Sequence, residues 1–399
     1  MKNDFLLGNT LFRDVGIYNG MGHHRTGGDG ETQTNNWIAT ELKIAGLEVS
    51  FQEFTTRQFF VRESKLLIGN TTIACFPYWF PCASVSGRVN GKLTAYGAQE
   101  TPYKDKIVVY RNTSSLRSRR ESESLINNLS GTGALAVILI SNTPSGEIAL
   151  INSPHDALPW PIPVVFVGKK DEITLQMALD QQNEITLLFN GEYRNNTRTN
   201  NIFGRWGGND DIIVVSTPKS GWFNCGGERG SGVALALGIA RWIGERKTSI
   251  AYWLDFNTGH ELNYLGTRHF LSEKAPRPEK VKAWVHLGAN IATWDFKNTP
   301  QGILRHANPA RYPVVCSNND FLSVAKQAII DIPRVKPYVG EGIGEFGPVI
   351  REGYRGFGIY GGDYFYFHTP ADGPHGTAPE LLEPVMNSLV TALTIIEKM

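Results

Sequence analysis

The sequence lacks the features of a membrane-spanning or disulfide-rich secreted protein. No segment offers the roughly 20 consecutive apolar residues that cross a bilayer, and the first nine residues contain no apolar run of the length that a signal sequence needs. The four cysteines have neither CxxC nor Cys/His finger spacing, which favours free thiols over disulfides or a cysteine-based zinc site: Cys75, Cys82, Cys225 and Cys316. We therefore expect a cytoplasmic protein.

An excess of charge of one sign is missing as well. Lysine and arginine number 39 against 38 aspartates and glutamates, and no basic block is longer than Arg117-Ser-Arg-Arg120. This balance argues against a nucleic-acid partner or an anionic membrane surface. With 399 residues, 41% of them hydrophobic, the chain can build one large core and a second domain. We expect a small-molecule or peptide-like partner.

Hydrophobic periodicity divides the chain into two kinds of segment. In the first kind, apolar strands alternate with amphipathic or apolar helices, which predicts an α/β fold with a mostly parallel sheet and helices on both faces. The predicted strands are 47–54, 212–215, 249–254, 282–287 and 356–360, and the predicted helices are 34–44, 233–243, 264–272, 321–331 and 379–398.

Between these segments, the pattern of hydrophobic residues predicts a mostly β insert. Short apolar runs at 106–110, 134–140, 164–167 and 185–189 are separated by Gly, Pro, Asn and Ser, with two plausible helices at 122–129 and 173–179. We predict an insert domain at residues 63–192 and an α/β domain made of residues 1–62 and 193–399.

Polar residues gather just after the predicted strands of the α/β domain. Parallel sheets hold their sites beyond the carboxyl ends of the strands, so these residues are expected to meet. They fall in four groups: Ser216 to Ser220 followed by Cys225 to Gly232, Asp255 to Glu261, His286 to Asn290, and Tyr366 to Asp372.

These groups make the chain resemble the zinc aminopeptidase family, which includes aminopeptidase Y, leucyl aminopeptidases, glutamate carboxypeptidase and glutaminyl cyclases. Thr258-Gly-His-Glu-Leu-Asn-Tyr-Leu-Gly-Thr267 is similar to the family's metal-site signature, and Tyr366-Phe-His-Thr-Pro-Ala-Asp372 is similar to its last ligand motif. Residues 24–28 and 41–49 resemble its N-terminal segment. The resemblance covers nearly the whole chain, and it implies that the insert is a protease-associated domain.

The resemblance also implies where two zinc ions would be held. The family uses a His, a bridging Asp, a Glu, a second Asp and a final His, with another Glu as general base. On this chain the first His falls on Thr217, with Lys219 at the companion Asp, and the two Asp ligands fall on Gly227 and Gly288. Only two ligands are kept, Glu261 and His368, and the general base becomes His260.

Two retained ligands do not hold a pair of zinc ions, since a catalytic zinc generally needs three protein ligands and a paired site also needs a bridge. The charge of Lys219 would repel a cation further. We therefore favour no cofactor. The alternative is a single zinc ion on His260, Glu261, His286 and His368, although a lone histidine in an apolar strand, such as His286, more often fills a buried polar slot.

Without a metal, the chemistry would come from imidazoles and carboxylates. We predict His260, Glu261, Glu228 and His368 as catalytic residues, with His260 as general base. Glu228 and Arg229 stand where a helix start offers backbone donors to an anion, although an acid at a helix start also has a purely structural explanation.

Further residues beside these groups are predicted to bind substrate: Arg229, Trp222, Cys225, Tyr366 and Asp372. His368 with Asp372 is an alternative acid/base pair. A second variant makes Cys225 a nucleophile, because a thiol near a helix start has a lowered pKa and His260 could take its proton. Free cysteines are more often small buried hydrophobes.

Three functions follow from these residues. The leading prediction is a hydrolase of an amide bond in a small or peptide-like substrate, with a degraded dinuclear zinc centre and His/Glu acid-base chemistry. One alternative is an aminopeptidase with a rearranged single zinc site. The other is a catalytically silent relative that binds a small molecule or peptide, because fold alone does not guarantee chemistry. An insert of this type also suits a homo-oligomer contact.

Overall fold

The chain forms two compact units. The computed structural model describes residues 4–84, 86–98, 103–111, 113, 118–208 and 211–399. The first unit comprises Met1–Phe54, Arg198–Phe367 and Asp372–Met399, and the second comprises Thr55–Thr197 and His368–Ala371. The chain passes from one unit to the other within two long strands that pair with each other, β1 (Glu48–Ile68) and β7 (Glu184–Trp206). The domain boundaries drawn from the sequence at residues 63 and 192 stay a prediction.

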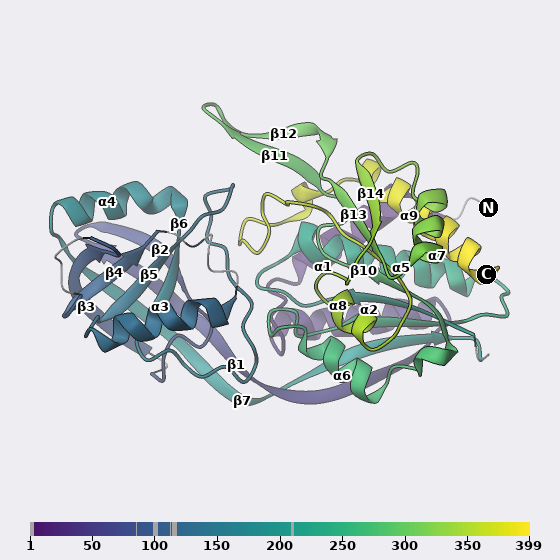
Figure 1. The fold of residues 1–399 in the computed structure, drawn as a ribbon, viewed down its shortest axis with the longest axis horizontal. Coiled ribbons are helices and arrows are strands. Elements are labelled where there is room, and N and C mark those ends of the chain that lie inside the picture. Colours follow the sequence, from purple (N-terminus) through teal and green to yellow (C-terminus); the bar gives the residue numbers. More distant parts are fainter. Residues whose placement is uncertain (1–3, 85, 99–102, 112, 114–117, 209–210) are drawn as a thin grey trace. The chain divides into compact units, whose positions relative to one another are not determined.

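A mostly parallel sheet forms the centre of the first unit (Figure 1). Its order is β7-β9-β8-β10-β15-β13-β14. Strands β9, β8, β10 and β15 run parallel, whereas β7 and β13 are antiparallel to their neighbours β9 and β15. The bounds are β8 (Ile212–Pro218), β9 (Ala251–Asn257), β10 (Val281–Leu287), β13 (Tyr312–Cys316), β14 (Val335–Val339) and β15 (Gly356–Ile359). The predicted fold class is confirmed.

Helices cover both faces of this sheet because its strands are apolar on both sides. On β8, Ile213 and Val215 pack into one apolar cluster with residues of α1, α2, α5, α7 and α9, while Ile212 and Val214 pack into another with α6 and α8. The bounds are α1 (Gly8–Gly20), α2 (Asp29–Ile44), α5 (Ser231–Gly244), α6 (Leu265–Glu273), α7 (Asn319–Ala328), α8 (Phe346–Arg351) and α9 (Pro379–Glu397). A continuous apolar run such as that of β8 is typical of a strand buried on both faces.

The second unit is rich in strands and has its own apolar core. Its sheet has the order β1-β2-β6-β5-β4-β3-β7, with β6, β5, β4 and β3 parallel and the others antiparallel. The bounds are β2 (Thr71–Pro77), β3 (Ser86–Ala95), β4 (Lys106–Tyr110), β5 (Ala136–Ser141), β6 (Val164–Gly168), α3 (Arg119–Gly131) and α4 (Glu172–Asp180). The core residues come from the strands of this sheet and from α4, together with Cys82 of the segment after β2.

Several predicted elements differ from the observed ones in their extent. The strands predicted at 47–54 and 185–189 are only parts of β1 and β7, because each continues across the junction between the units. The helix predicted from Thr34 begins at Asp29, and the helix predicted to end at Asp331 ends at Ala328. Helix α1 and the hairpin of β11 (Trp294–Thr299) and β12 (Gly302–Pro309) were not predicted.

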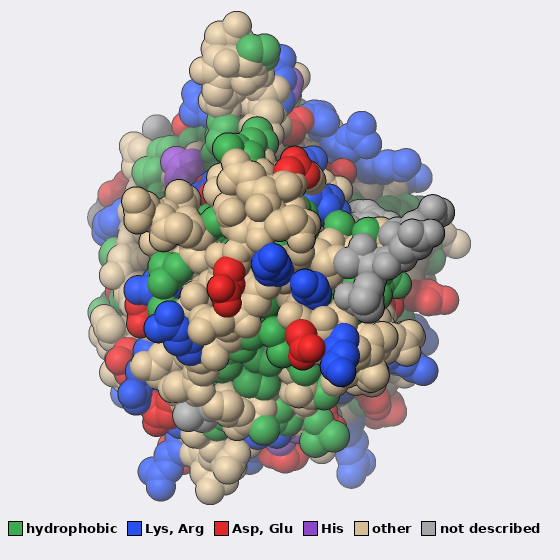
Figure 2. Space-filling model, turned by 90° about the vertical axis from the view of Figure 1, so that its left-hand side faces the viewer, with side chains coloured by type: hydrophobic (Ala, Val, Ile, Leu, Met, Phe, Trp, Pro, Cys, Tyr) green, Lys and Arg blue, Asp and Glu red, His purple; other side chains and the backbone are tan. Residues whose placement is uncertain are grey.

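The surface carries both signs of charge close together. Figure 2 shows one face of the molecule, on which lysines and arginines alternate with acidic residues and hydrophobic side chains lie between them. This mixed pattern agrees with the balanced composition. Among the described helices, none combines the length and apolar character that crossing a membrane requires.

Asp255 is a buried carboxyl group at the carboxyl end of β9. Its side chain is 1% exposed, and it accepts a hydrogen bond of 3.3 Å from the Asn257 amide at Oδ2. Burial raises its pKa to about 8, and the Asn257 hydrogen bond and the charge of Lys219 only partly oppose this effect. The folded state therefore keeps a proton here that the unfolded chain releases near the ordinary pKa of aspartate.

Replacing Asp255 with Asn should change how stability depends on pH. Because the folded pKa lies above the unfolded one, Asp255 lowers the free energy of unfolding progressively from about pH 4 to about pH 8, by up to ~1.4 kcal/mol per pH unit. In denaturant unfolding from pH 5 to pH 9, the free energy of unfolding of D255N minus that of the wild type should therefore increase as pH rises, with no further increase above pH 8. Asp331→Asn, at an exposed position, is the control. A constant difference across this range would contradict the argument.

Candidate functional site

The first component of the site is a turn of π-helix, Gly226–Gly230, which follows β8 and leads into α5. The Asp372 carboxylate accepts hydrogen bonds from the backbone nitrogens of Gly227 at 3.0 Å and Glu228 at 2.9 Å. The Tyr364 hydroxyl donates to the same carboxylate at 2.7 Å. Asp372, predicted to bind substrate, thus positions the start of the helix, and its three hydrogen bonds fix the backbone from which Glu228 projects.

Glu228 and Arg229 form a buried ion pair. Arg229 Nη2 lies 2.8 Å from Glu228 Oε1, and the two side chains are 1% and 0% exposed. Burial opposes the charged form of Arg229, but Glu228 and then Glu345 outweigh that effect and raise the pKa of the guanidinium above its ordinary value. Charge of both signs is therefore fixed at the start of α5, next to the ends of the parallel strands.

His260 approaches Glu228 from the loop after β9. Its Nε2 lies 4.0 Å from Glu228 Oε1, and its Nδ1 lies 2.6 Å from Glu345 Oε1. Burial alone would raise the pKa of Glu345, but the His260 charge and hydrogen bond, followed by Arg229, hold it well below the usual range. Glu345 thus turns the Nε2 atom of His260 towards Glu228.

Glu345 was missed by the sequence analysis. It is the residue before α8, in the glycine-rich segment 340–347. It lies 85 residues from His260 in the chain. No spacing rule connects two such loops, so the available signal was only that a glycine-rich segment followed β14.

His368 completes a group of three candidate ligands. His368 belongs to the short segment between Phe367 and Asp372, and its backbone has a left-handed φ of 58°. Its Nδ1 lies 2.9 Å from the Leu150 carbonyl oxygen. Among the residues that the structure describes, ligand atoms of Glu228, His260 and His368 all lie within 4.8 Å of one another. Three of the four residues predicted to be catalytic are thus brought together.

The fourth, Glu261, is not part of this group. Its Oε1 accepts from the Thr26 backbone nitrogen at 2.7 Å and its Oε2 from the Ser220 hydroxyl at 3.1 Å. Burial raises the pKa of this carboxyl group, and the hydrogen bonds from Thr26 only partly oppose that. Its carboxylate therefore ties the N-terminal segment to the loops after β8 and β9, which differs from the predicted catalytic role.

His286 is likewise engaged elsewhere. Its Nδ1 lies 2.9 Å from the Ser216 hydroxyl, to which Trp284 Nε1 donates at 2.8 Å. The ring is completely buried, and burial lowers its pKa to about 4. The structure thus gives His286 the buried polar slot considered above. Of the four residues in the predicted single-ion set, His260 and His368 lie in the candidate group with Glu228, and Glu261 and His286 do not.

Lys219, whose charge was expected to repel a cation, forms a buried ion pair. Lys219 Nζ lies 2.8 Å from Glu31 Oε1, and both side chains are fully buried. Glu31 also accepts hydrogen bonds from Gly27, Thr199 and Thr258. The lysine charge is therefore neutralised by a carboxylate from α2 that the sequence analysis did not consider.

Two glycines stand where the resemblance places aspartate ligands, and the space beside each is filled. A Cβ atom on Gly227 would overlap the Tyr364 hydroxyl and approach Asp372 Oδ1. A Cβ atom on Gly288 would overlap the Tyr360 ring, whose hydroxyl donates to the Ile343 carbonyl at 2.6 Å. Neither position leaves room for a side chain without movement of a buried tyrosine.

The remaining predicted substrate-binding residues are buried. Cys225 has a left-handed φ of 52°, and burial, followed by the charge of Glu228, raises the pKa of its thiol well above the ordinary value. This direction is opposite to that required by the nucleophile variant. Trp222 is 0% exposed, and Tyr366 packs edge-on against His375 with ring centroids 5.0 Å apart.

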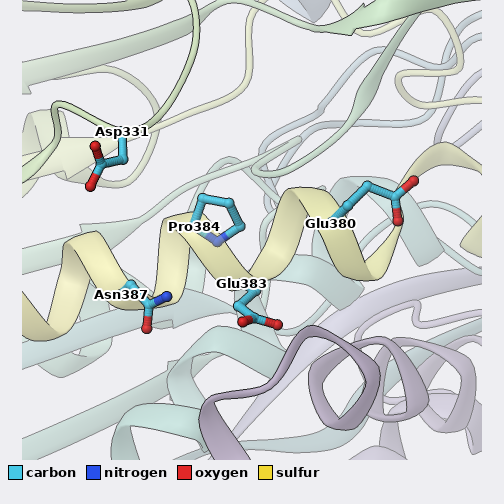
Figure 3. Close-up of a pocket in the computed structure, with 5 residues that line it drawn as sticks. All are labelled: Asp331, Glu380, Glu383, Pro384 and Asn387. Carbon is cyan, nitrogen blue, oxygen red and sulfur yellow. The ribbon is translucent and has the colours of Figure 1, made fainter.

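A pocket elsewhere on the first unit has a different character. It has a volume of about 350 Å³ and is lined along α9 and by the residue Asp331, with three carboxylates among its five lining residues (Figure 3). One of them, Glu383, already accepts a hydrogen bond from the Gly8 backbone nitrogen at 2.8 Å. None of the strand-end residues lines it, so it is separate from the group of Glu228, His260 and His368.

Comparison with known proteins gives a fold but no close relative. No family model matches the chain, and no curated protein matches its sequence. The structure is similar to BSAP, a zinc aminopeptidase from Bacillus subtilis, with a TM-score of 0.75 and 18% identity over 98% of this chain and 95% of that one. The structure is also similar to a Peptidase M28 precursor from Shewanella amazonensis, with a TM-score of 0.76 and 16% sequence identity over 98% of this chain and 93% of that one.

A glutaminyl cyclase from Fimbriiglobus ruber is also similar, with a TM-score of 0.53 and 10% identity over 98% of this chain and 95% of that one. The matches extend over both units and nearly the full length of each neighbour. At such identities they establish the architecture only. This protein therefore has the aminopeptidase-like α/β fold.

Proposed function

We propose that this protein is a hydrolase of a peptide-like amide bond that works with a single divalent cation, zinc being the first choice, held by Glu228, His260 and His368. The observation that carries the proposal is the convergence of the three ligand atoms within 4.8 Å. Two imidazoles and one carboxylate, with a fourth position left for water, are the donor set of many catalytic zinc sites. The aminopeptidase-like fold supports the choice of reaction class.

The neighbours of the ligands fit the same interpretation. Metal-binding histidines usually donate their second ring N–H to a carboxylate or a backbone carbonyl, which fixes the tautomer and orientation of the ring. His260 Nδ1 is 2.6 Å from Glu345, and His368 Nδ1 is 2.9 Å from the Leu150 carbonyl. In both rings, Nδ1 is thus engaged by the protein, and Nε2 is the nitrogen that would bind an ion.

A single ion suits this centre better than two. The two aspartate positions implied by the resemblance are glycines, and Tyr364 and Tyr360 take up the space beside them. A paired site needs a bridging ligand, and Glu228 is the one carboxylate of the group. These observations favour loss of the dinuclear arrangement, with a mononuclear one in its place.

When bound, the ion would polarise the substrate carbonyl and lower the pKa of a bound water. The protein's own residues supply position and charge. Glu345 orients His260, and Asp372 fixes the backbone of Glu228. Arg229 provides a positive charge 2.8 Å from Glu228 Oε1. Enclosure excludes bulk water, because His260 and His368 are only 5% and 8% exposed.

A metal-free hydrolase is the second candidate, and the Arg229 ion pair favours it. At 2.8 Å from Glu228 Oε1, the guanidinium already provides a positive charge where a cation would bind. His260, oriented by Glu345, would then take a proton from water at Nε2. Retained turnover after complete removal of metal would distinguish this candidate from the first.

For residues 63–192, a protease-associated type of insert remains our proposal. The second unit has its own core and consists mainly of strands, which supports it. We also propose a small-molecule or peptide-like substrate and no nucleic-acid partner, from the balanced charge. Self-association through the insert is proposed from the same resemblance.

Metal content provides the first test of the leading proposal. Protein purified without chelator should carry close to one zinc ion per chain by mass spectrometry of the metals, and chelation should abolish hydrolysis of a peptide library until zinc is returned. His260→Ala and His368→Ala should each lower zinc affinity by at least ~100-fold, because each removes one of three ligands. His306→Ala, on β12, is the matched control. A metal-free protein with full activity would reject the metal site and leave the second candidate.

The role of Glu345 gives an independent test. Glu345→Gln removes the carboxylate that orients His260, so zinc affinity should fall about 10–100-fold, as is usual when the partner of a ligand histidine is lost. Glu341→Gln changes an exposed residue of the same loop and should leave the affinity unchanged. Competition titration with a zinc chelator measures both. Equal affinities in the two variants would show that Glu345 does not act through a metal ligand.

A further inference from the structure

Arg229 has hydrogen-bonding capacity that the proposed function leaves unused. A guanidinium carries five N–H donors in a planar fork. Arg229 is 1% exposed, and its close charged neighbour is Glu228, 2.8 Å from Nη2. Among the described residues, none accepts a hydrogen bond of good geometry from its Nε, Nη1 or Nη2 atoms. Buried donors normally find an acceptor, because leaving them unpaired costs stability.

The position of this guanidinium is as informative as its unused donors. It lies 2.8 Å from Glu228 Oε1, the same oxygen from which His260 Nε2 is 4.0 Å away, so the guanidinium lies beside the candidate ligand group. Besides Glu228, the groups that act on its charge are Glu345 and the side chains of Cys225 and Tyr18. An acceptor that satisfied the remaining donors would therefore lie beside the reacting atoms, and it would meet a positive charge.

We propose that Arg229 is a catalytic residue that binds the acyl oxygen of the substrate and stabilises the negative charge that develops there. This inference rests on the proposed hydrolysis. Water forms a bond to the acyl carbon, and the π electron pair of the carbonyl moves to the acyl oxygen, where the Arg229 N–H groups donate to it. The pair then returns to re-form the carbonyl, the C–N bond breaks, and the amine leaves with a proton supplied by the water.

A buried donor of this kind stabilises the transition state more than the ground state, because the acyl oxygen is charged only in the former. Removing one such donor typically costs about 10²–10³-fold in kcat. Lysine at this position would retain the charge that pairs with Glu228 but would lose the planar fork. Arg229→Lys is therefore expected to fold and to lose selectively the forked arrangement of N–H donors.

Inorganic phosphate is the probe, since it is a small tetrahedral anion like the species formed at the acyl carbon. Calorimetric titration of the purified full-length protein should show phosphate binding, and R229K should bind it at least tenfold more weakly with unchanged zinc content. Arg246→Lys is the matched control, since Arg246 also forms a fork-like pair, with Glu397 at 2.9 and 2.8 Å, away from the centre. It should bind phosphate as the wild type does.

Equal phosphate affinity in R229K and the wild type, or no binding to the wild type, would overturn the inference. If R229K fails to fold, a crystal of the wild type soaked in phosphate provides the test. A phosphate ion within hydrogen-bond distance of Arg229 would support the inference. A phosphate ion bound elsewhere, or no bound phosphate, would reject it. Neither measurement needs turnover. Phosphate bound by Arg229 in a protein without hydrolytic activity would refute the proposed function while keeping Arg229 as an anion-binding residue.

Discussion

The Asp372 carboxylate and the two backbone N–H groups of Gly227 and Glu228 form the interaction on which the candidate site depends. These hydrogen bonds join Asp372, at the end of the motif Tyr366 to Asp372, to the π-helical turn that follows β8. Asp372 is 145 residues from Gly227 and 144 residues from Glu228. A carboxylate at a helix start gains both hydrogen bonds and a favourable dipole. Because the Glu228 nitrogen is one of the donors, the same contact that closes the fold also fixes the direction of the Glu228 side chain.

Charge compensation is the second constraint on this centre. Glu228 and Glu345 are both fully buried and lie near one arginine, Arg229, and one imidazole, His260. Burying a carboxylate lowers stability unless an opposite charge or hydrogen-bond donor lies beside it. Here Glu228 and Glu345 share Arg229 and His260 as such partners. A divalent cation beside Glu228 and His260 would balance the remaining negative charge, whereas an anion alone would be held only by Arg229. In the proposed mechanism the two positive charges are complementary, since the cation would polarise the carbonyl and lower the pKa of water, while the guanidinium would donate hydrogen bonds to the acyl oxygen.

The sequence predicted the architecture well because the strand-helix alternation is a local pattern. Apolar strands such as β8 and the buried helix α5 follow from their own residues, and the rule about carboxyl strand ends correctly grouped Glu228 with His260. It did not predict Glu345 or the Leu150 carbonyl, which lie in loops 85 and 218 residues from their partners. Such contacts depend on loop geometry, and no periodicity encodes it.

The same limit explains why Glu261 and its neighbour His260, both predicted to be catalytic, have different surroundings in the structure. Adjacent residues share a motif, but their side chains leave the backbone in different directions, and Glu261 turns towards Thr26 and Ser220 while His260 turns towards Glu228. A ligand retained in sequence is therefore not necessarily retained in space. The carboxylate of the centre comes instead from Glu228, one residue after the glycine at the expected position. A shift of one residue on a π-helical turn is enough to move a carboxylate, and Tyr364 fills the space beside that glycine. An aspartate at Gly227 would have to displace both that tyrosine and the Asp372 contact, so this position is coupled to two buried neighbours.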